Sequence, residues 1–116
     1  MDNKFKSEHN FEIRLNEAKG VMVKYKERLP IIVQKTKDCK LPNIDKCKYL
    51  VPRDMSMGQF VYVIRKRIKL DSSEALFICV NNQLASSSES IDSIYHKYKD
   101  EDGFMYIFYT SENTFG

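Results

Sequence analysis

The sequence is poor in glycine and proline, with 4 Gly and 3 Pro in 116 residues. This scarcity, together with 42% hydrophobic and 30% charged residues, excludes a low-complexity or disordered chain and predicts one compact domain. Long hydrophobic runs are also missing: runs such as Ala75–Val80 have six residues, whereas a membrane span needs about 20. The N-terminal residues offer no apolar stretch of signal-peptide length. We therefore expect a cytosolic protein that is too short for a multidomain enzyme.

Cysteine and histidine are few and lie far apart. Cys39, Cys47 and Cys79 are an odd number of thiols without a Cys-x-x-Cys pair, so neither a disulfide framework nor a zinc site is predicted. His9 and His96 have no cysteine or serine nearby that could act with them as a nucleophile. Glycine-rich phosphate loops and His-Glu-x-x-His patterns are absent from the sequence. We therefore expect no metal, no cofactor and no enzymatic activity.

The net charge of +3 conceals an uneven distribution. Residues 1–70 carry 17 basic against 8 acidic side chains, whereas residues 71–116 carry 2 against 8. A basic half suits acidic peptides or anionic lipid, although such an imbalance is more often a solvated surface than a site. The interleaved basic and aromatic stripe typical of a nucleic-acid binder is not evident, so we expect little affinity for RNA or DNA.

Apolar periodicity predicts an amphipathic helix over Phe11–Tyr25, with Arg14 among its solvent-facing residues. Before it, Lys4–Glu8 predicts a brief helix or a mobile arm. Ser56 and Gln59 match a capping box, which predicts the start of a second long helix. The stripe of the first helix consists of Phe11, Leu15, Ala18, Met22 and Tyr25.

Four segments predict strands. The last two are apolar at every position, as is typical of central strands covered on both faces. A turn at Asn81-Asn82 and a further helix over Ile91–Tyr98 complete the order α-β-β-α-β-α-β, and 35–46 is expected to be a loop. This order predicts a mixed sheet with a helix packed on one face, the pattern of a ubiquitin-like β-grasp with an N-terminal helical addition. The predicted strands are Leu29–Gln34, Lys48–Val51, Leu76–Val80 and Phe104–Tyr109.

Several motifs carry a more specific resemblance. They are Lys46–Pro52, Met57–Phe60, Ile64–Ile68, Phe77–Asn82, Tyr98–Phe104 and Tyr109–Gly116. In their order and separation they resemble the autophagy-related ubiquitin-like modifiers, most closely the GABARAP branch. The resemblance implies an α+β protein: a ubiquitin-like β-grasp with a four-stranded mixed sheet and two additional N-terminal helices. It places a helical extension at 1–26, the core at 27–110 and a flexible C-terminal conjugation tail at 111–116.

The same resemblance implies that Gly116 is joined to the headgroup amine of phosphatidylethanolamine. A terminal glycine has no Cβ, so activating and conjugating enzymes can hold its carbonyl carbon in a narrow channel. Most members of the family are made with residues beyond this glycine, which a cysteine protease removes. Here either the gene encodes this end or the sequence is a processed form.

A second implied feature is an exposed strand over Lys48–Val51 that accepts an extended peptide with an aromatic-x-x-aliphatic motif. By family position, the aromatic pocket is lined by Glu17, Val21, Pro30, Ile32, Lys48, Leu50 and Phe104. The aliphatic pocket is lined by Tyr49, Val51, Pro52, Met55, Phe60 and Val63. Arg28, Lys46, Lys48 and Arg67 are expected to contact the acidic residues that flank such peptides.

Phe77 and Cys79 correspond to a surface with which the family contacts conjugation machinery or ubiquitin-interacting-type helices. Cys79 replaces a larger apolar residue, so we favour a structural strand here.

Taken alone, each residue predicted for the two peptide pockets is better explained as core or solvated surface, and only the complete set favours a site.

The leading hypothesis is a modifier that is lipidated at Gly116 and recruits motif-bearing cargo receptors and adaptors to autophagosomal or related membranes. Its other expected partners are the activating and conjugating enzymes and a deconjugating cysteine protease. It is expected to be a cytoplasmic monomer that becomes membrane-associated on lipidation. The alternative is an unconjugated trafficking or microtubule-linked adaptor that binds the same kind of motif.

Overall fold

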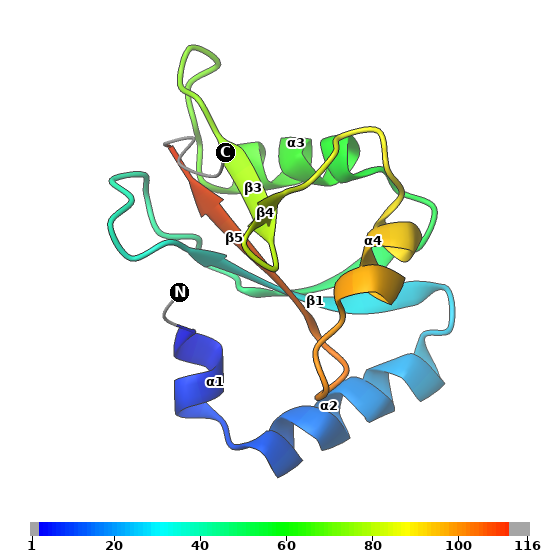
Figure 1. Cartoon of the computed structure of the whole chain (residues 1–116). Coiled ribbons are helices and arrows are strands. Elements are labelled where there is room, and N and C mark those ends of the chain that lie inside the picture. Colours follow the sequence, from blue (N-terminus) through cyan, green and yellow to red (C-terminus); the bar gives the residue numbers. More distant parts are fainter. Residues whose placement is uncertain (1–2, 112–116) are drawn as a thin grey trace.

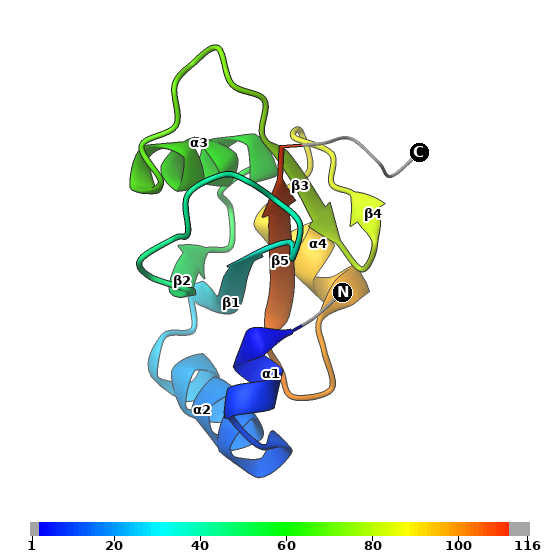
Figure 2. The same ribbon diagram turned by 90° about the vertical axis from the view of Figure 1, so that its left-hand side faces the viewer.

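A computed structural model describes residues 3–111. Two short strands and three longer ones form a mixed sheet between two pairs of helices (Figures 1 and 2). The helices are α1 (Lys4–Glu8), α2 (Phe11–Lys24), α3 (Met57–Arg67) and α4 (Ile91–Tyr98). The strands are β1 (Arg28–Lys35), β2 (Lys48–Pro52), β3 (Phe77–Val80), β4 (Gln83–Leu84) and β5 (Met105–Thr110).

The sheet has five strands in the order β2-β1-β5-β3-β4, so the predicted count of four is wrong. The additional strand, β4, pairs with β3 through two residues only, Gln83 and Leu84. The predicted Asn81-Asn82 turn creates this pair, since both residues adopt the left-handed conformation, with φ of 54° and 64°. β1 and β5 are parallel at the centre of the sheet, and the other pairs are antiparallel.

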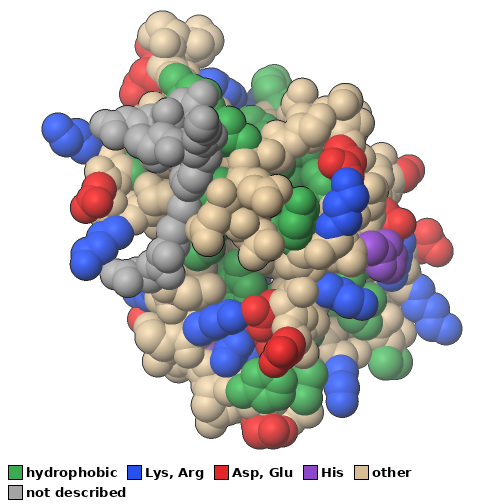
Figure 3. Space-filling view, viewed as in Figure 1, with side chains coloured by type: hydrophobic (Ala, Val, Ile, Leu, Met, Phe, Trp, Pro, Cys, Tyr) green, Lys and Arg blue, Asp and Glu red, His purple; other side chains and the backbone are tan. Residues whose placement is uncertain are grey.

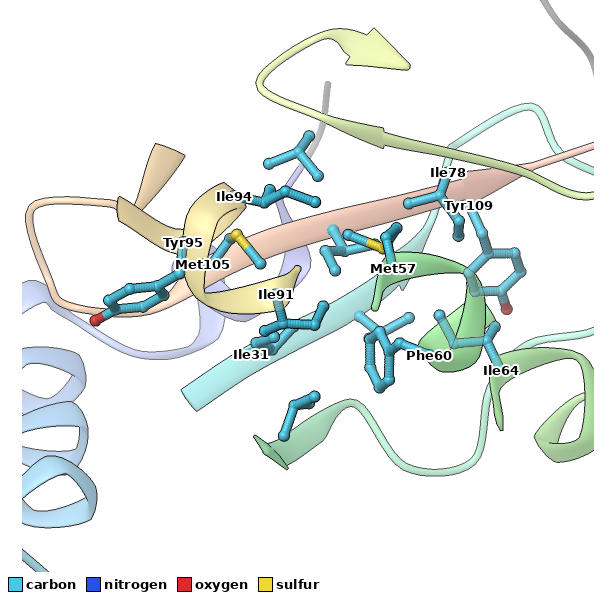
Figure 4. Close-up of a cluster of buried hydrophobic side chains, with 14 of the residues drawn as sticks. Ile31, Met57, Phe60, Ile64, Ile78, Ile91, Ile94, Tyr95, Met105 and Tyr109 are labelled. Carbon is cyan, nitrogen blue, oxygen red and sulfur yellow. The ribbon is translucent and has the colours of Figure 1, made fainter. Parts of the chain in front are cut away.

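The face of the sheet under α3 and α4 carries the main core. Side chains from both helices point toward β1 and β5, as Figure 4 shows for Phe60 of α3 and Ile91 of α4. The capping box at the start of α3 is confirmed: Gln59 N–H donates to Ser56 Oγ at 3.1 Å, and Ser56 N–H donates to Gln59 Oε1 at 2.9 Å. This cap fixes the first turn of α3 and thereby directs its apolar side onto the sheet.

The opposite face is covered by α1 and α2. Phe5 of α1 and Ala18 of α2 are buried there against Ile32, Phe104 and Tyr106. The predicted stripe of α2 is only partly buried, because Phe11 and Tyr25 at its two ends are each 39% exposed. The expectation that Arg14 faces solvent is wrong, since Arg14 is buried between α2 and the loop before β5. The charge of Arg14 is tolerated there because a buried carboxylate faces it.

Candidate functional site

β2 forms one edge of the sheet, since β1 is its only neighbour among the described strands. Val33 N–H donates to Cys47 C=O at 2.8 Å, and Arg53 N–H donates to Glu27 C=O at 3.2 Å. Hydrogen-bonded and non-hydrogen-bonded pairs alternate along an antiparallel ladder. The N–H and C=O groups of Lys48 and Leu50 therefore point outward, away from β1. These outward groups, with the side chains of β2, are called the β2 edge below.

Successive side chains of β2 lie on opposite faces of the sheet. Lys48 and Leu50 pair with Ile32 and Pro30 and lie on the side of α2. Tyr49 and Val51 pack with the core on the side of α3. A chain that adds to the β2 edge therefore meets different surfaces on its two faces.

The residues predicted for the aromatic pocket gather between α2 and β2. Lys48 Nζ lies 2.8 Å from Glu17 Oε2, so an ion pair bridges the mouth between the two elements. Val21 lies one helical turn beyond Glu17 and is half-buried, as is Leu50. Ile32 and Phe104 are 0% and 2% exposed, and Pro30 is also buried, so these three residues can serve only as the floor of a pocket.

The residues predicted for the aliphatic pocket lie between β2 and α3. The rings of Tyr49 and Phe60 meet edge to face, with centroids 5.6 Å apart. Val51 and Phe60 are each 2% exposed and belong to the core. Tyr49, Pro52 and Met55 are half-buried, and Val63 is 37% exposed, so these four can be reached from outside.

The hydroxyl of Tyr49 is buried and has no hydrogen-bond partner within residues 3–111. Burial raises the pKa of this phenol, so the group remains a neutral donor. Lys46 Nζ lies 5.3 Å from the centre of the Tyr49 ring, a cation–π distance. The aliphatic pocket therefore has a polar group in its wall as well as an apolar floor.

The four cations predicted to contact acidic flanks are all exposed, but they have different partners. Arg28 Nη1 donates to the carbonyl oxygen of Leu50 at 3.0 Å. Arg67 Nε donates to Asp45 Oδ1 at 2.8 Å, and this bond is the main reason that the pKa of Asp45 is lowered. Figure 3 shows that basic and acidic side chains are interleaved on the face viewed in Figure 1, so the charge surplus of residues 1–70 does not form one continuous patch there.

A cavity of about 820 Å³ adjoins the β2 edge and was not predicted from the sequence. It lies between α1, the end of β1 and the loop before β2, and Cys47 and Lys48 form part of its wall. Of the predicted pocket residues only Lys48 lines it, so the cavity is a neighbour of the aromatic pocket and not the pocket itself.

The predicted Phe77 and Cys79 surface is only half accessible. Cys79 is 0% exposed and lies under α1 and α2, where burial raises the pKa of its thiol to about 11.

Gly116, the predicted conjugation site, lies outside the described residues. Within residues 3–111, no group of three or more His, Cys, Asp or Glu side chains could hold a metal ion, and no helix is long and apolar enough to cross a membrane.

A buried polar network was also missed. The carboxylate of Asp102 is 0% exposed and accepts from Arg14 Nη1 at 2.6 Å, from Phe104 N–H at 2.8 Å and from the Tyr106 hydroxyl. Arg14 Nε donates to His9 C=O at 3.0 Å. The network joins α2 and the end of α1 to the start of β5, and therefore fixes α2, the helix that forms one side of the aromatic pocket.

Known proteins resemble the whole chain. A family model described as "Autophagy protein Atg8 ubiquitin like" matches residues 13–116. Autophagy-related protein 8 of Scheffersomyces stipitis is 53% identical over 116 residues, 100% of this chain and 84% of the relative. Autophagy-related protein 8e of Arabidopsis thaliana is 54% identical over 112 residues, 97% of this chain and 92% of the relative. The crystal structure of Trypanosoma brucei ATG8 matches with a TM-score of 0.93 at 46% identity and covers 100% of both chains.

The structural match confirms the predicted ubiquitin-like α+β fold. The names of the relatives do not specify a branch, so the closeness to the GABARAP branch stays a prediction. Atg8 proteins are ubiquitin-like modifiers and not enzymes, as expected for this chain. With more than half of its residues identical to Atg8 proteins along its full length, the chain belongs to the Atg8 family of ubiquitin-like autophagy proteins.

Proposed function

We propose that this chain is conjugated through Gly116 to phosphatidylethanolamine, and that its β2 edge binds aromatic-x-x-aliphatic peptides. It thereby recruits cargo receptors and adaptors to autophagosomal or related membranes. Activating and conjugating enzymes load it, and a cysteine protease releases it. The observation that carries the peptide-binding part is the β2 edge, where outward backbone groups lie between two partly accessible apolar surfaces.

The spacing of the motif fits the geometry of the edge. Side chains alternate in an extended peptide, so two residues three positions apart point to opposite faces of the sheet. The surface around Leu50 lies on the α2 face, and the surface around Tyr49 lies on the α3 face. An aromatic residue and an aliphatic residue three positions later can therefore enter the two surfaces together. A separation of two or four positions would direct both side chains to the same face.

The backbone supplies the affinity that does not depend on sequence. Lys48 and Leu50 offer outward N–H and C=O groups that a peptide strand can pair with, as in β-augmentation. The ion pair between Lys48 and Glu17 must open or shift when a large aromatic side chain enters between α2 and β2. This pair is exposed, so its rearrangement costs little, about 0–1 kcal/mol.

Substitutions in β2 test the peptide site. Leu50→Ala removes an apolar wall and Lys48→Glu reverses a charge, and each should weaken binding of an acidic aromatic-x-x-aliphatic peptide by about 1–3 kcal/mol. Fluorescence anisotropy with a labelled Trp-x-x-Leu peptide measures the dissociation constant, and circular dichroism checks that the variants fold. Lys19→Glu is the matched control, since it makes the same charge change on the exposed surface of α2. Unchanged dissociation constants for both β2 variants would show that the peptide binds elsewhere.

Gly116 is proposed as the conjugation site because the chain belongs to the Atg8 family and Gly116 lies in the Tyr109–Gly116 motif that carries the resemblance. A phosphatidylethanolamine anchor adds two acyl chains, each buried CH₂ contributing about 0.8 kcal/mol, which is enough for stable membrane attachment. Some of the Lys and Arg side chains of residues 1–70 could then add about 1 kcal/mol each near an anionic surface.

Intact mass spectrometry of the membrane fraction tests the conjugation. The wild type should carry the mass of phosphatidylethanolamine, and Gly116→Ala should lose both the added mass and the membrane association while it still binds the motif peptide. If Gly116→Ala stays on membranes unchanged, conjugation through this residue is wrong and the unconjugated adaptor becomes the better hypothesis.

A further inference from the structure

The side chain of Arg28 lies over the β2 edge. It is the first residue of β1, lies opposite Pro52 and is exposed. Its Nη1 donates to the carbonyl oxygen of Leu50 at 3.0 Å. Within residues 3–111 the side chain of Arg28 makes this hydrogen bond and no ion pair. The guanidinium therefore lies over the backbone of the edge strand, held by a single neutral acceptor.

The acceptor that Arg28 uses is one that a bound peptide needs. The carbonyl of Leu50 points away from β1, as the pairing on either side of it requires. A strand that adds to this edge donates a backbone N–H to that oxygen. The peptide must therefore displace Arg28 from Leu50 or share the oxygen with it.

We propose that Arg28 is a displaceable cap on the β2 edge and determines which segments can bind there. The proposal rests on the proposed peptide binding and adds a selection step to it. A peptide without acidic residues breaks the bond between Arg28 and Leu50 and gives the guanidinium no new partner. A peptide with a carboxylate near Pro52 offers the displaced guanidinium a charge-assisted, two-pronged acceptor that is stronger than a neutral carbonyl.

The cap has a further physical benefit. An exposed strand edge with unpaired N–H and C=O groups is a template for unwanted pairing with other chains, and charged side chains at the edge are a common protection. Arg28 covers the one outward acceptor of Leu50 without closing the edge permanently, since its side chain is long and lies in solvent. Neutral or apolar segments are thereby disfavoured, and acidic ones are admitted.

Arg67 provides a matched comparison. It is an exposed arginine with the same predicted role toward acidic flanks, but its Nε is bonded to the side chain of Asp45 and not to the backbone of β2. Removal of Arg67 can weaken attraction to acidic peptides, yet it frees no acceptor on the edge. The two arginines are therefore distinguished by what happens to a neutral peptide.

The test compares wild type, Arg28→Ala and Arg67→Ala with two labelled peptides. Both peptides carry one Trp-x-x-Leu core; one has glutamates on both flanks, and in the other each Glu is replaced by Gln. Arg28→Ala should bind the neutral peptide about two- to tenfold more tightly than wild type, the effect of one freed hydrogen-bond acceptor. The preference of Arg28→Ala for the acidic peptide should be smaller than that of wild type, because the neutral peptide binds more tightly and the acidic peptide loses its contact with the guanidinium. Arg67→Ala should bind the neutral peptide as wild type does.

The outcomes separate the two proposals. If Arg28→Ala binds the neutral peptide no better than wild type while wild type binds the acidic peptide, the peptide site stands and the cap is refuted. If wild type binds neither peptide, the proposed peptide site itself fails. The cap can also be observed without any peptide: the carbonyl ¹³C resonance of Leu50 should shift in Arg28→Ala and stay in place in Arg67→Ala. An unshifted Leu50 resonance in Arg28→Ala would refute the hydrogen bond in solution.

Discussion

The buried network around Asp102 gives the sharpest prediction about stability. Arg14→Met keeps most of the apolar stem of the side chain but removes the guanidinium that faces Asp102. The carboxylate is 0% exposed and would keep only Phe104 N–H and the Tyr106 hydroxyl as donors. Removing one partner of a buried ion pair costs about 3–5 kcal/mol, because the remaining charge stays without its counterion.

The chain contains a close control for this substitution. Arg53 makes the same two kinds of contact as Arg14: its Nε donates to a backbone carbonyl at 2.9 Å, and its Nη1 donates to Asp92 at 2.7 Å. The difference is burial, because the side chains of Arg53 and Asp92 are 32% and 40% exposed. For a pair this exposed, Arg53→Met should cost only about 0–1 kcal/mol.

Urea unfolding followed by circular dichroism measures both losses. With a slope of about 1.5 kcal/mol/M, Arg14→Met should lower the unfolding midpoint by about 2–3 M, and Arg53→Met by much less. Asp102→Asn combined with Arg14→Met should recover part of the loss, since the unpaired charge is removed while an oxygen remains for Phe104 N–H. Equal losses for the two arginine variants would refute the argument from burial.

Three further predictions address pH, a helix cap and thiol reactivity. Burial opposes ionisation of Asp100, but the hydrogen bond from Lys6 and further favourable contacts hold its pKa below the ordinary value. This carboxylate therefore stabilises the fold above about pH 4 and loses that contribution as pH falls through its folded pKa. The difference in unfolding free energy between wild type and Lys6→Met should therefore shrink from pH 6 to pH 3; a constant difference would contradict the assignment. Ser56→Ala should destabilise the protein by about 1 kcal/mol in urea unfolding, because the N-cap acceptor of α3 is lost. With a maleimide reagent, half-buried Cys47 should react before Cys79, whose thiol has a pKa of about 11 and is 0% exposed.

Local patterns predicted most of the secondary structure. The capping box at Ser56 placed the start of α3, and the all-apolar strands proved to be β3 and β5, both inside the sheet. β4 was missed because Gln83 and Leu84 are both exposed and form too short a segment for an apolar pattern. Only the turn residues before β4 signalled a hairpin, and a turn alone does not show that a second strand follows it.

The prediction puts Arg14 on the wrong side of α2 because it follows the charge of the residue and not its position in the helical repeat. It lies one turn before buried Ala18, so helical geometry alone puts both on one face. A charged side chain at such a position is ordinarily assigned to solvent, and the carboxylate that makes its burial possible is 88 residues further along the chain. No local pattern connects Arg14 with Asp102, and only the folded chain brings them together.

The edge position of β2 likewise depends on distant pairing. β2 follows β1 in the sequence and pairs with it, but β1 acquires β5 as its second neighbour only from the other end of the chain. The sequence of β2 is equally compatible with a central strand. Only the family resemblance therefore predicts that β2 is available to a peptide. Burial decides which pocket residues form the floor and which can be reached from outside. Ile32 and Phe60 are buried, whereas Val21 and Val63 are at least partly accessible.

The missed network and the predicted pocket are physically connected through α2. Arg14 and Glu17 are three residues apart and lie on neighbouring positions of the helix surface. Arg14 anchors α2 to the start of β5, and Glu17 reaches across to Lys48 on β2. The gap into which we propose an aromatic side chain enters is thus set by a buried ion pair on one side and an exposed ion pair on the other. Because the buried pair is the more expensive to break, α2 should stay in place when a peptide opens the Lys48 contact, and the adjustment should fall on exposed side chains.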